Sequence, residues 1–263
     1  MDQQILDKII KQVTDELAPG SGKAQSLAQA VTTASSVTEF VGTAMGDTIG
    51  LVIANVDPSL TELMGLGKYK SIGIISDRVG AGPQIYAVDE AVKASNTEVI
   101  SVELPRDTKG GGGHGCLIYV GAEDVSDARR AVEISLGVLP KYFGDVYSND
   151  AGHLEFQYTA RASYCLQKSL GAPLGRAFGI ALGSPAGIGT VIADTVVKAA
   201  NVEVVGYCSP TKGTSYSNEV ILTFTGDSGA VRQALRASIE VGKKLMGALD
   251  GGVEPKSATT PYI

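Results

Sequence analysis

The stretch GTVIADTVVKAANVEVVGY, residues 189–207, determines how the chain is organised, because a related stretch occurs about 105 positions earlier. That earlier stretch, residues 83–103, reads PQIYAVDEAVKASNTEVISVE. Seven residues recur in the same order, with Asp89, Val92, Lys93, Ala94, Asn96, Glu98 and Val99 matching Asp194, Val197, Lys198, Ala199, Asn201, Glu203 and Val204. The chain therefore contains an internal duplication.

Each copy of the repeat reads as a helix that leads into a strand. Apolar residues recur at helical spacing before the shared asparagine, and a short β-branched run follows it. A similar apolar strand precedes each helix, at residues 71–76 and 177–182. A polar loop, an apolar strand and a second helix follow in both copies. One unit is thus strand, helix, strand, loop, strand and helix.

Several further segments, taken together with the repeat, resemble one known family. They are EFVGTAMGDTIGLVIANVD from residue 39, SIGIISDRVGAGP from 71, VELPRDTKGGGGHG from 102, YTARASY from 158 and TFTGDSGAVRQAL from 223. These segments look like those of tandem-domain shell proteins of bacterial microcompartments, of the propanediol-utilisation type. The resemblance covers residues 36–263, and the number of ordered segments makes it specific.

The resemblance implies a fold and a role. It implies an α+β chain with two tandem, circularly permuted ferredoxin-like shell domains. It also implies a non-enzymatic structural protein whose homotrimers are pseudohexamers and tile the shell, in the cytoplasm, beside other shell proteins. Passage of small polyols such as 1,2-propanediol or glycerol through a pore follows from the same resemblance. No cofactor is implied.

The chain divides into three predicted segments. Its length of 263 residues suits two domains of ordinary size, and the duplication favours two. We expect a first shell domain at residues 37–148 and a second at 149–263, divided near the polar turn cluster SNDAG at residues 148–152. Residues 1–36 precede both domains.

Residues 2–17 predict a short amphipathic helix. Its apolar stripe is Ile5, Leu6, Ile9, Ile10, Val13 and Leu17. Pro19-Gly20 ends the helix, and small polar residues then predict a flexible linker over residues 18–36. A helix this short usually gains order from a partner groove, so residues 2–17 are a candidate docking helix for cargo enzymes. Packing on its own domain is the alternative.

Composition argues against several classes of protein. A net charge of −6, with scattered lysines and arginines, gives no basic surface for nucleic acid. No apolar run is long enough to span a membrane, and the N-terminus does not read as a secretory signal. The three cysteines, Cys116, Cys165 and Cys208, lack metal-binding spacing and read as free core thiols. The two histidines are too few for a common metal site.

The turn Gly80 to Ile85 supplies the alternative function. It follows a strand, opens a helix and precedes Glu103 by about twenty residues, which is most of a dinucleotide-binding pattern. A small-molecule or nucleotide-binding enzyme or sensor could use such a turn. Against this, Ile85 replaces the third glycine, and Pro83 removes a backbone donor. We find no catalytic constellation elsewhere in the sequence.

Two loops at the same place in each repeat are the candidate pore residues, because the resemblance implies that this loop borders the central opening of a ring of domains. They are Asp107, Thr108, Lys109, Gly110, Gly111, Gly112, Gly113 and His114 in the first copy, and Thr214, Ser215, Tyr216, Ser217 and Asn218 in the second. Glycine allows backbones to crowd around an axis, and the polar groups offer hydrogen bonds to small polyols. An ordinary solvated loop is the alternative.

The repeated lysine and asparagine are the candidate assembly residues. As bare residues, Lys93 and Lys198 are solvated charges at helix ends. The resemblance implies that they lie, with Asn96 and Asn201, along the edge where neighbouring tiles meet.

Overall fold

The computed structural model describes residues 38–78, 80–105, 115–213, 218–250, 252–255 and 263. The chain divides into two units, Met1–Glu39 and Phe40–Ile263, and the second contains both copies of the repeat. Within the described residues, no helix is long and apolar enough to cross a membrane. The predicted N-terminal helix lies outside the described residues.

The two halves of the repeat have the same order of elements. The first half contains β1 (Thr38–Ala44), β2 (Thr48–Ile53), α3 (Pro58–Thr61), β3 (Ser71–Asp77), α4 (Gly82–Lys93), β4 (Glu98–Glu103), β5 (Cys116–Ala122) and α5 (Val125–Phe143). The second contains β6 (Val146–Asn149), β7 (Gly152–Thr159), α6 (Tyr164–Leu170), β8 (Ala177–Ser184), α7 (Ala186–Ala199), β9 (Val202–Cys208), β10 (Val220–Gly226), α8 (Ser228–Asp250) and β11 (Glu254–Pro255). The duplication seen in the sequence is therefore a duplication of structure.

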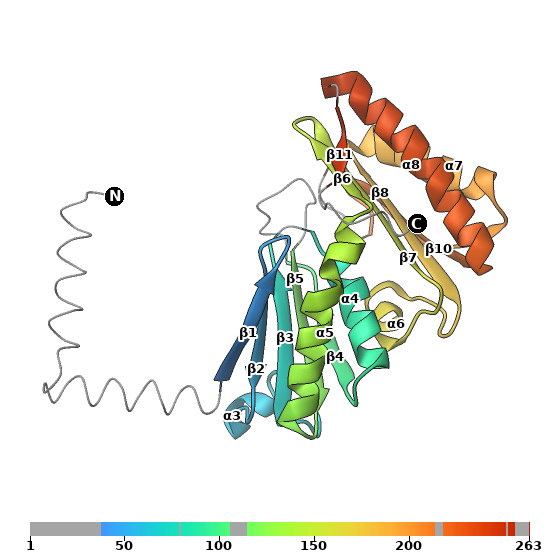
Figure 1. Ribbon diagram of the computed structural model, residues 1–263. Coiled ribbons are helices and arrows are strands. Elements are labelled where there is room, and N and C mark those ends of the chain that lie inside the picture. Colours follow the sequence, from blue (N-terminus) through green and yellow to red (C-terminus); the bar gives the residue numbers. More distant parts are fainter. Residues whose placement is uncertain (1–37, 79, 106–114, 214–217, 251, 256–262) are drawn as a thin grey trace, which may run out of the picture. The chain divides into compact units, whose positions relative to one another are not determined.

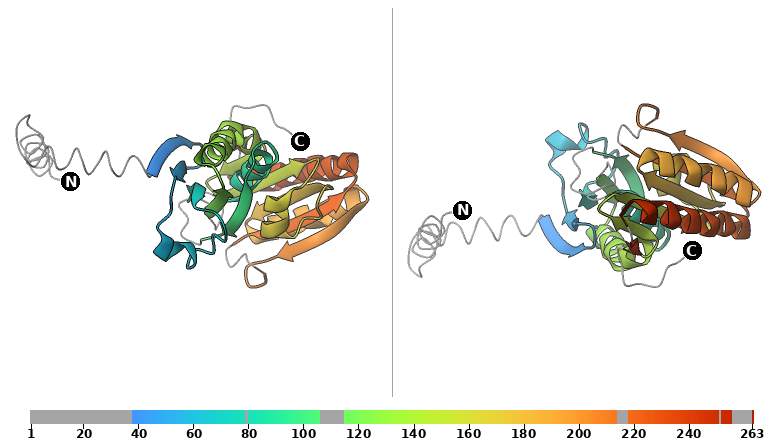
Figure 2. Two further views of the ribbon diagram at one scale, coloured as in Figure 1. Left: turned by 90° about the horizontal axis from the view of Figure 1, so that it is seen from below. Right: turned by 90° about the horizontal axis from the view of Figure 1, so that it is seen from above.

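Each half forms one antiparallel sheet covered by helices. The strand orders, β1-β2-β3-β5-β4 and β11-β6-β7-β8-β10-β9, correspond strand for strand apart from the added β11. Both edge strands, β4 and β9, carry a bulge at the equivalent place, after Val99 and after Val204. Helices α4 and α5 pack together beside the first sheet (Figure 1), and α7 and α8 lie side by side against the second (Figure 2). This arrangement confirms the predicted α+β class.

The predicted domain division falls inside a strand. Residues 146–149 form β6, which pairs antiparallel with β7 in the second sheet. The division at 148/149 remains a prediction of the sequence.

Core packing explains why glycine interrupts the central strands. A Cβ atom on Gly73 of β3 would lie 2.7 Å from a methyl of Val132 and 3.0 Å from the carbonyl oxygen of Ala128, both on α5. Gly179 occupies the same place in β8, where a Cβ would meet Phe224 and Val231. Helix and sheet therefore approach more closely than a side chain permits.

The first core continues into the second half of the chain. Its buried residues include Ile75 and Val132 of the first half, but also Leu166 and Phe178 of the second. A separate core lies between the second sheet and its helices, around Phe156 and Leu235.

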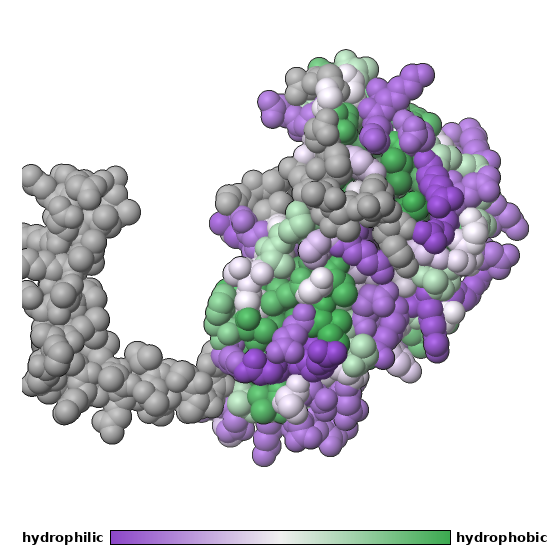
Figure 3. All heavy atoms as spheres, in the orientation of Figure 1, coloured by the Kyte–Doolittle hydropathy of each residue, from purple (hydrophilic) through white to green (hydrophobic). Residues whose placement is uncertain are grey.

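On its outer side the first half also presents hydrophobic residues around β1 and α5 (Figure 3), where Phe40 is exposed.

Two of the three cysteines are free core thiols, as the sequence predicts. Cys116 and Cys165 are buried, and burial raises the pKa of both thiols well above the ordinary value. Cys208, at the end of β9, forms no disulfide and is only half-buried, so it is not a core thiol.

Candidate functional site: assembly surfaces and loops

Most of the predicted pore residues lie outside the described residues. These are Asp107 to His114 in the first loop and Thr214 to Ser217 in the second. Asn218 is described, and its exposed side-chain oxygen accepts a hydrogen bond from the backbone N–H of Ala186 at 3.4 Å. It therefore lies beside the start of α7. The pore residues stay a prediction.

The contact between the two halves is centred on Asp89 of α4. We call the packing of α4 and β4 on α6 and β7 the internal seam. Helix α6 has no side-chain cap of its own. The Asp89 carboxylate accepts hydrogen bonds from the backbone N–H groups of Ser163 at 3.0 Å and Leu166 at 3.3 Å, and from the Ser163 hydroxyl. Asp89 therefore caps a helix that belongs to the other half of the chain.

Lys93 completes this arrangement. Its ammonium lies 2.8 Å from Asp89 and 3.7 Å from Glu90. It also donates to the hydroxyl of Thr159 on β7 at 3.3 Å. The Lys93 side chain is only one-quarter exposed, so it is a bridging cation of the internal seam as well as a predicted assembly residue.

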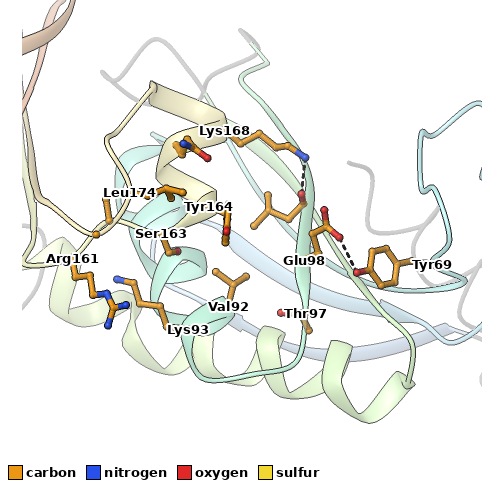
Figure 4. A pocket seen from close by; sticks show the side chains of 14 residues that line it. Tyr69, Val92, Lys93, Thr97, Glu98, Arg161, Ser163, Tyr164, Lys168 and Leu174 are labelled. Carbon is orange, nitrogen blue, oxygen red and sulfur yellow. Dashed lines mark hydrogen bonds between the residues drawn. The ribbon is translucent and has the colours of Figure 1, made fainter.

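A hollow of about 980 Å³ opens beside the internal seam (Figure 4). Its lining includes three cations, Lys93, Arg161 and Lys168. Lys168 donates to the carbonyl oxygens of Val99 and Ile100, at 2.8 Å each, where β4 bulges. The hollow is therefore a basic recess, and Lys168 hydrogen-bonds one side of it to β4, the edge strand of the first sheet.

Tyr69 and Glu98 form the opposite side of this hollow. The Tyr69 hydroxyl donates to the Glu98 carboxylate at 2.8 Å, and this hydrogen bond raises the pKa of the tyrosine. Sequence reasoning identified Lys93 but missed Arg161 and Lys168, because neither recurs in the other copy: Asn55 and Glu62 stand in their places. Comparing the two copies for differences rather than for matches would have found them.

The equivalent surface of the second half is open. Lys198 lies 2.6 Å from Asp194, as Lys93 lies near Asp89, but the Lys198 side chain is 73% exposed. Val191, Val197, Val204 and Tyr207, on α7 and β9, are exposed apolar residues. Asn96 and Asn201, the other predicted assembly residues, are both exposed. The second half therefore presents an uncovered copy of the surface that α6 covers in the first.

The Gly80 to Ile85 turn is unsuited to a nucleotide. A Cβ atom on Gly82 would lie 1.6 Å from the buried Glu155 carboxylate of β7, so that acidic group lies at the start of α4. A carboxylate at this position would repel a pyrophosphate. In addition, β3 pairs antiparallel with both of its neighbours, whereas dinucleotide-binding sheets are mostly parallel. Among the described residues, no group of His, Cys, Asp and Glu could hold a metal ion.

Comparison with known proteins identifies the repeat. The model of the BMC domain matches twice, at residues 71–149 and 177–253. The chain is similar to the bacterial microcompartment shell protein PduB of Salmonella typhimurium, with 56% identity over 99% of this chain and 97% of that protein. It is also 62% identical to PduB of Citrobacter freundii over 87% of this chain and 84% of that protein.

Two solved structures are also similar to this chain along most of its length. A trimeric bacterial microcompartment shell protein PduB matches 86% of this chain and 99% of its own, with a TM-score of 0.82 and 53% identity. EtuB from Clostridium kluyveri matches 86% of this chain and 98% of its own, with a TM-score of 0.81 and 56% identity.

Proposed function

Because the chain belongs to the BMC-domain family, as one of its PduB-type microcompartment shell proteins, we propose that it is a structural tile of a bacterial microcompartment shell and not an enzyme. The observation that carries this proposal is the 56% identity to a PduB shell protein along 99% of the chain. The tile would lie in the shell within the bacterial cytoplasm, beside other shell proteins. The antiparallel sheets and the Glu155 carboxylate at the Gly80 turn speak against the nucleotide-binding alternative.

The assembled form of the tile is a homotrimer. Two similar but unequal domains in one chain can complete a six-domain ring only by three-fold repetition, and closed rings are the usual result of head-to-tail contacts. A related PduB structure is trimeric. Three copies of this chain would therefore form a pseudohexamer.

Native mass spectrometry and electron microscopy test this function. We expect a trimer mass in dilute solution and extended sheets of hexagonal outline at high concentration. A stable monomer or dimer would contradict the ring, and trimers that never form sheets, alone or with other shell proteins, would contradict the role as a tile.

The proposed pore conducts small polyols such as 1,2-propanediol or glycerol. Support comes from the two candidate loops, whose glycine, hydroxyl and amide groups suit neutral hydrogen-bonding solutes. Each hydrogen bond contributes about 1 kcal/mol, so binding is weak enough to allow passage. In crystals soaked in glycerol, we expect ligand beside residues 107–114 or 214–218. Glycerol bound only in a remote crevice would remove these loops from the proposal.

The proposed tile edge contains Lys93, Asn96, Lys198 and Asn201. The two asparagines test it best, because they are exposed and their replacement leaves Lys93 and Lys198 in place. We expect Asn96→Arg combined with Asn201→Arg to leave the trimer mass unchanged. The double variant should abolish the extended sheets of tiles, since bulky cations would face each other across tile edges. The control is Glu240→Arg on α8, an exposed site with the same total change in charge. Sheets of normal extent in the double variant would contradict the edge assignment.

Residues 2–17 are proposed to dock cargo enzymes. The support is the apolar stripe of this segment, which the duplicated core elements do not require. Its partner would be a hydrophobic groove on an encapsulated enzyme or on another shell protein.

A further inference from the structure

The internal seam predicts what the contact between two copies must resemble. In one chain, α6 of the second half covers α4 and β4 of the first. The equivalent elements, α3 of the first half and the α7–β9 surface of the second, have no such contact within the described part of the chain. In a ring of alternating halves, α3 of one copy comes to α7 and β9 of the next. We call this contact the intermolecular seam.

Exposure supports this correspondence position by position. Val99 is 2% exposed, but its counterpart Val204 is 53% exposed. On the covering side, Leu166 is 0% exposed and its counterpart Leu60 is 46% exposed. The backbone agrees too, because Val56 and Ala162 make the same hydrogen bond, to Lys70 and Arg176 respectively. Both partners of the second contact are therefore present in one chain and uncovered in it.

The charges at the two seams differ. Asp57 stands where the internal seam has Ser163, the hydroxyl donor to Asp89. Glu62 stands where the internal seam has Lys168, and Asn55 where it has Arg161. All three substitutions remove a hydrogen-bond donor or a cation from the covering side. At the internal seam the covering side contributes the cations Arg161 and Lys168, whereas at the intermolecular seam carboxylates stand on both sides.

We propose that Lys198 is the cation that makes the intermolecular seam possible, by neutralising Asp57 and Glu62 of the neighbouring copy together with its own Asp194. The proposal rests on the proposed trimer, and it gives Lys198 a role at the seam in addition to its proposed place at the tile edge. Lys93 shows how a lysine at this position reaches across a seam, since it contacts Thr159 of the other half as well as Asp89. Glu203, the remaining carboxylate on this surface, is already held by Arg176 at 3.1 Å. Two cations stand at the described positions equivalent to the lining of the hollow. Lys68, at the place of Leu174, already pairs with Glu123 at 3.0 Å, which leaves Lys198 to meet the neighbour.

Lys198→Met in the full-length chain tests the proposal, because it keeps the apolar stem and removes the charge. We expect the concentration of half-dissociation, measured by mass photometry or native mass spectrometry, to rise at least about tenfold, since three facing carboxylates would lack a counter-charge. Adding Glu62→Lys to this variant should restore the trimer, because it returns a cation to the same recess from the other side. Glu62→Lys alone should not weaken the trimer, since it repeats the internal seam's Lys168.

The matched control is Lys244→Met, an exposed lysine on α8 that should leave dissociation unchanged. Circular dichroism checks that each variant retains the wild-type fold. A Lys198→Met trimer as stable as the wild type would overturn the role of Lys198, and so would failure of Glu62→Lys to rescue it. If the wild type itself formed no trimer, the proposed function would fail and this inference with it. A wild-type trimer that tolerates Lys198→Met would remove the inference alone.

Discussion

At the scale of single residues, Asp89 and Asp194 show how one sequence motif serves two environments. Asp89 is 1% exposed and holds Ser163, Leu166 and Lys93 at once, whereas the Asp194 side chain is 56% exposed beside Lys198. We expect Asp89→Asn to destabilise the chain by about 2 kcal/mol, because it removes a charged acceptor from buried partners. Asp194→Asn is the matched control and should change stability by less than about 0.5 kcal/mol. Thermal unfolding at trimer-saturating concentration measures both, and equal shifts would contradict the capping role of Asp89.

At the scale of elements, the spacing between α5 and the first sheet depends on Gly73. We expect Gly73→Ala to destabilise the protein by about 1–3 kcal/mol, because its Cβ would meet Val132 and the Ala128 carbonyl group. Gly137→Ala is the same change on the exposed side of α5, where a Cβ meets nothing, and should stabilise by about 0.5–1 kcal/mol. Chemical denaturation of both variants measures the difference. A neutral Gly73→Ala would show that helix and sheet can move apart.

At the scale of the whole molecule, we expect the N-terminal segment to serve attachment and not stability. Deleting residues 2–35 should leave the trimer mass and melting temperature nearly unchanged, because the duplicated cores lie in residues 40–263. It should lower the amount of enzyme recovered with the shell protein from cells that make the compartment. Equal recovery together with a lowered melting temperature would show instead that the segment packs on its own domain.

The sequence alone was enough for the fold but not for the seams. The duplication could be predicted because Asp89 and Lys93 recur as Asp194 and Lys198, at the same spacing within the same pattern of helix and strand. Arg161 and Lys168 escaped notice, since their importance comes from a contact between elements far apart in the chain. The sequence also could not show that Lys93 is mostly covered and Lys198 mostly exposed. The two motifs are alike, and the motif does not tell which copy is covered by another domain.

During synthesis of the chain, Asp89 is made before the helix α6 that it caps. A ribosome releases Asp89 well before residues 163–170, so the carboxylate is already in place when α6 emerges. Helix α3 emerges before any partner exists, and it begins with its own cap, Asp57, which accepts the backbone N–H of Ser59 at 2.9 Å. The half made first can thus cap α3 with its own residue, while α6 of the half made second is capped by a residue that the same polypeptide has already provided.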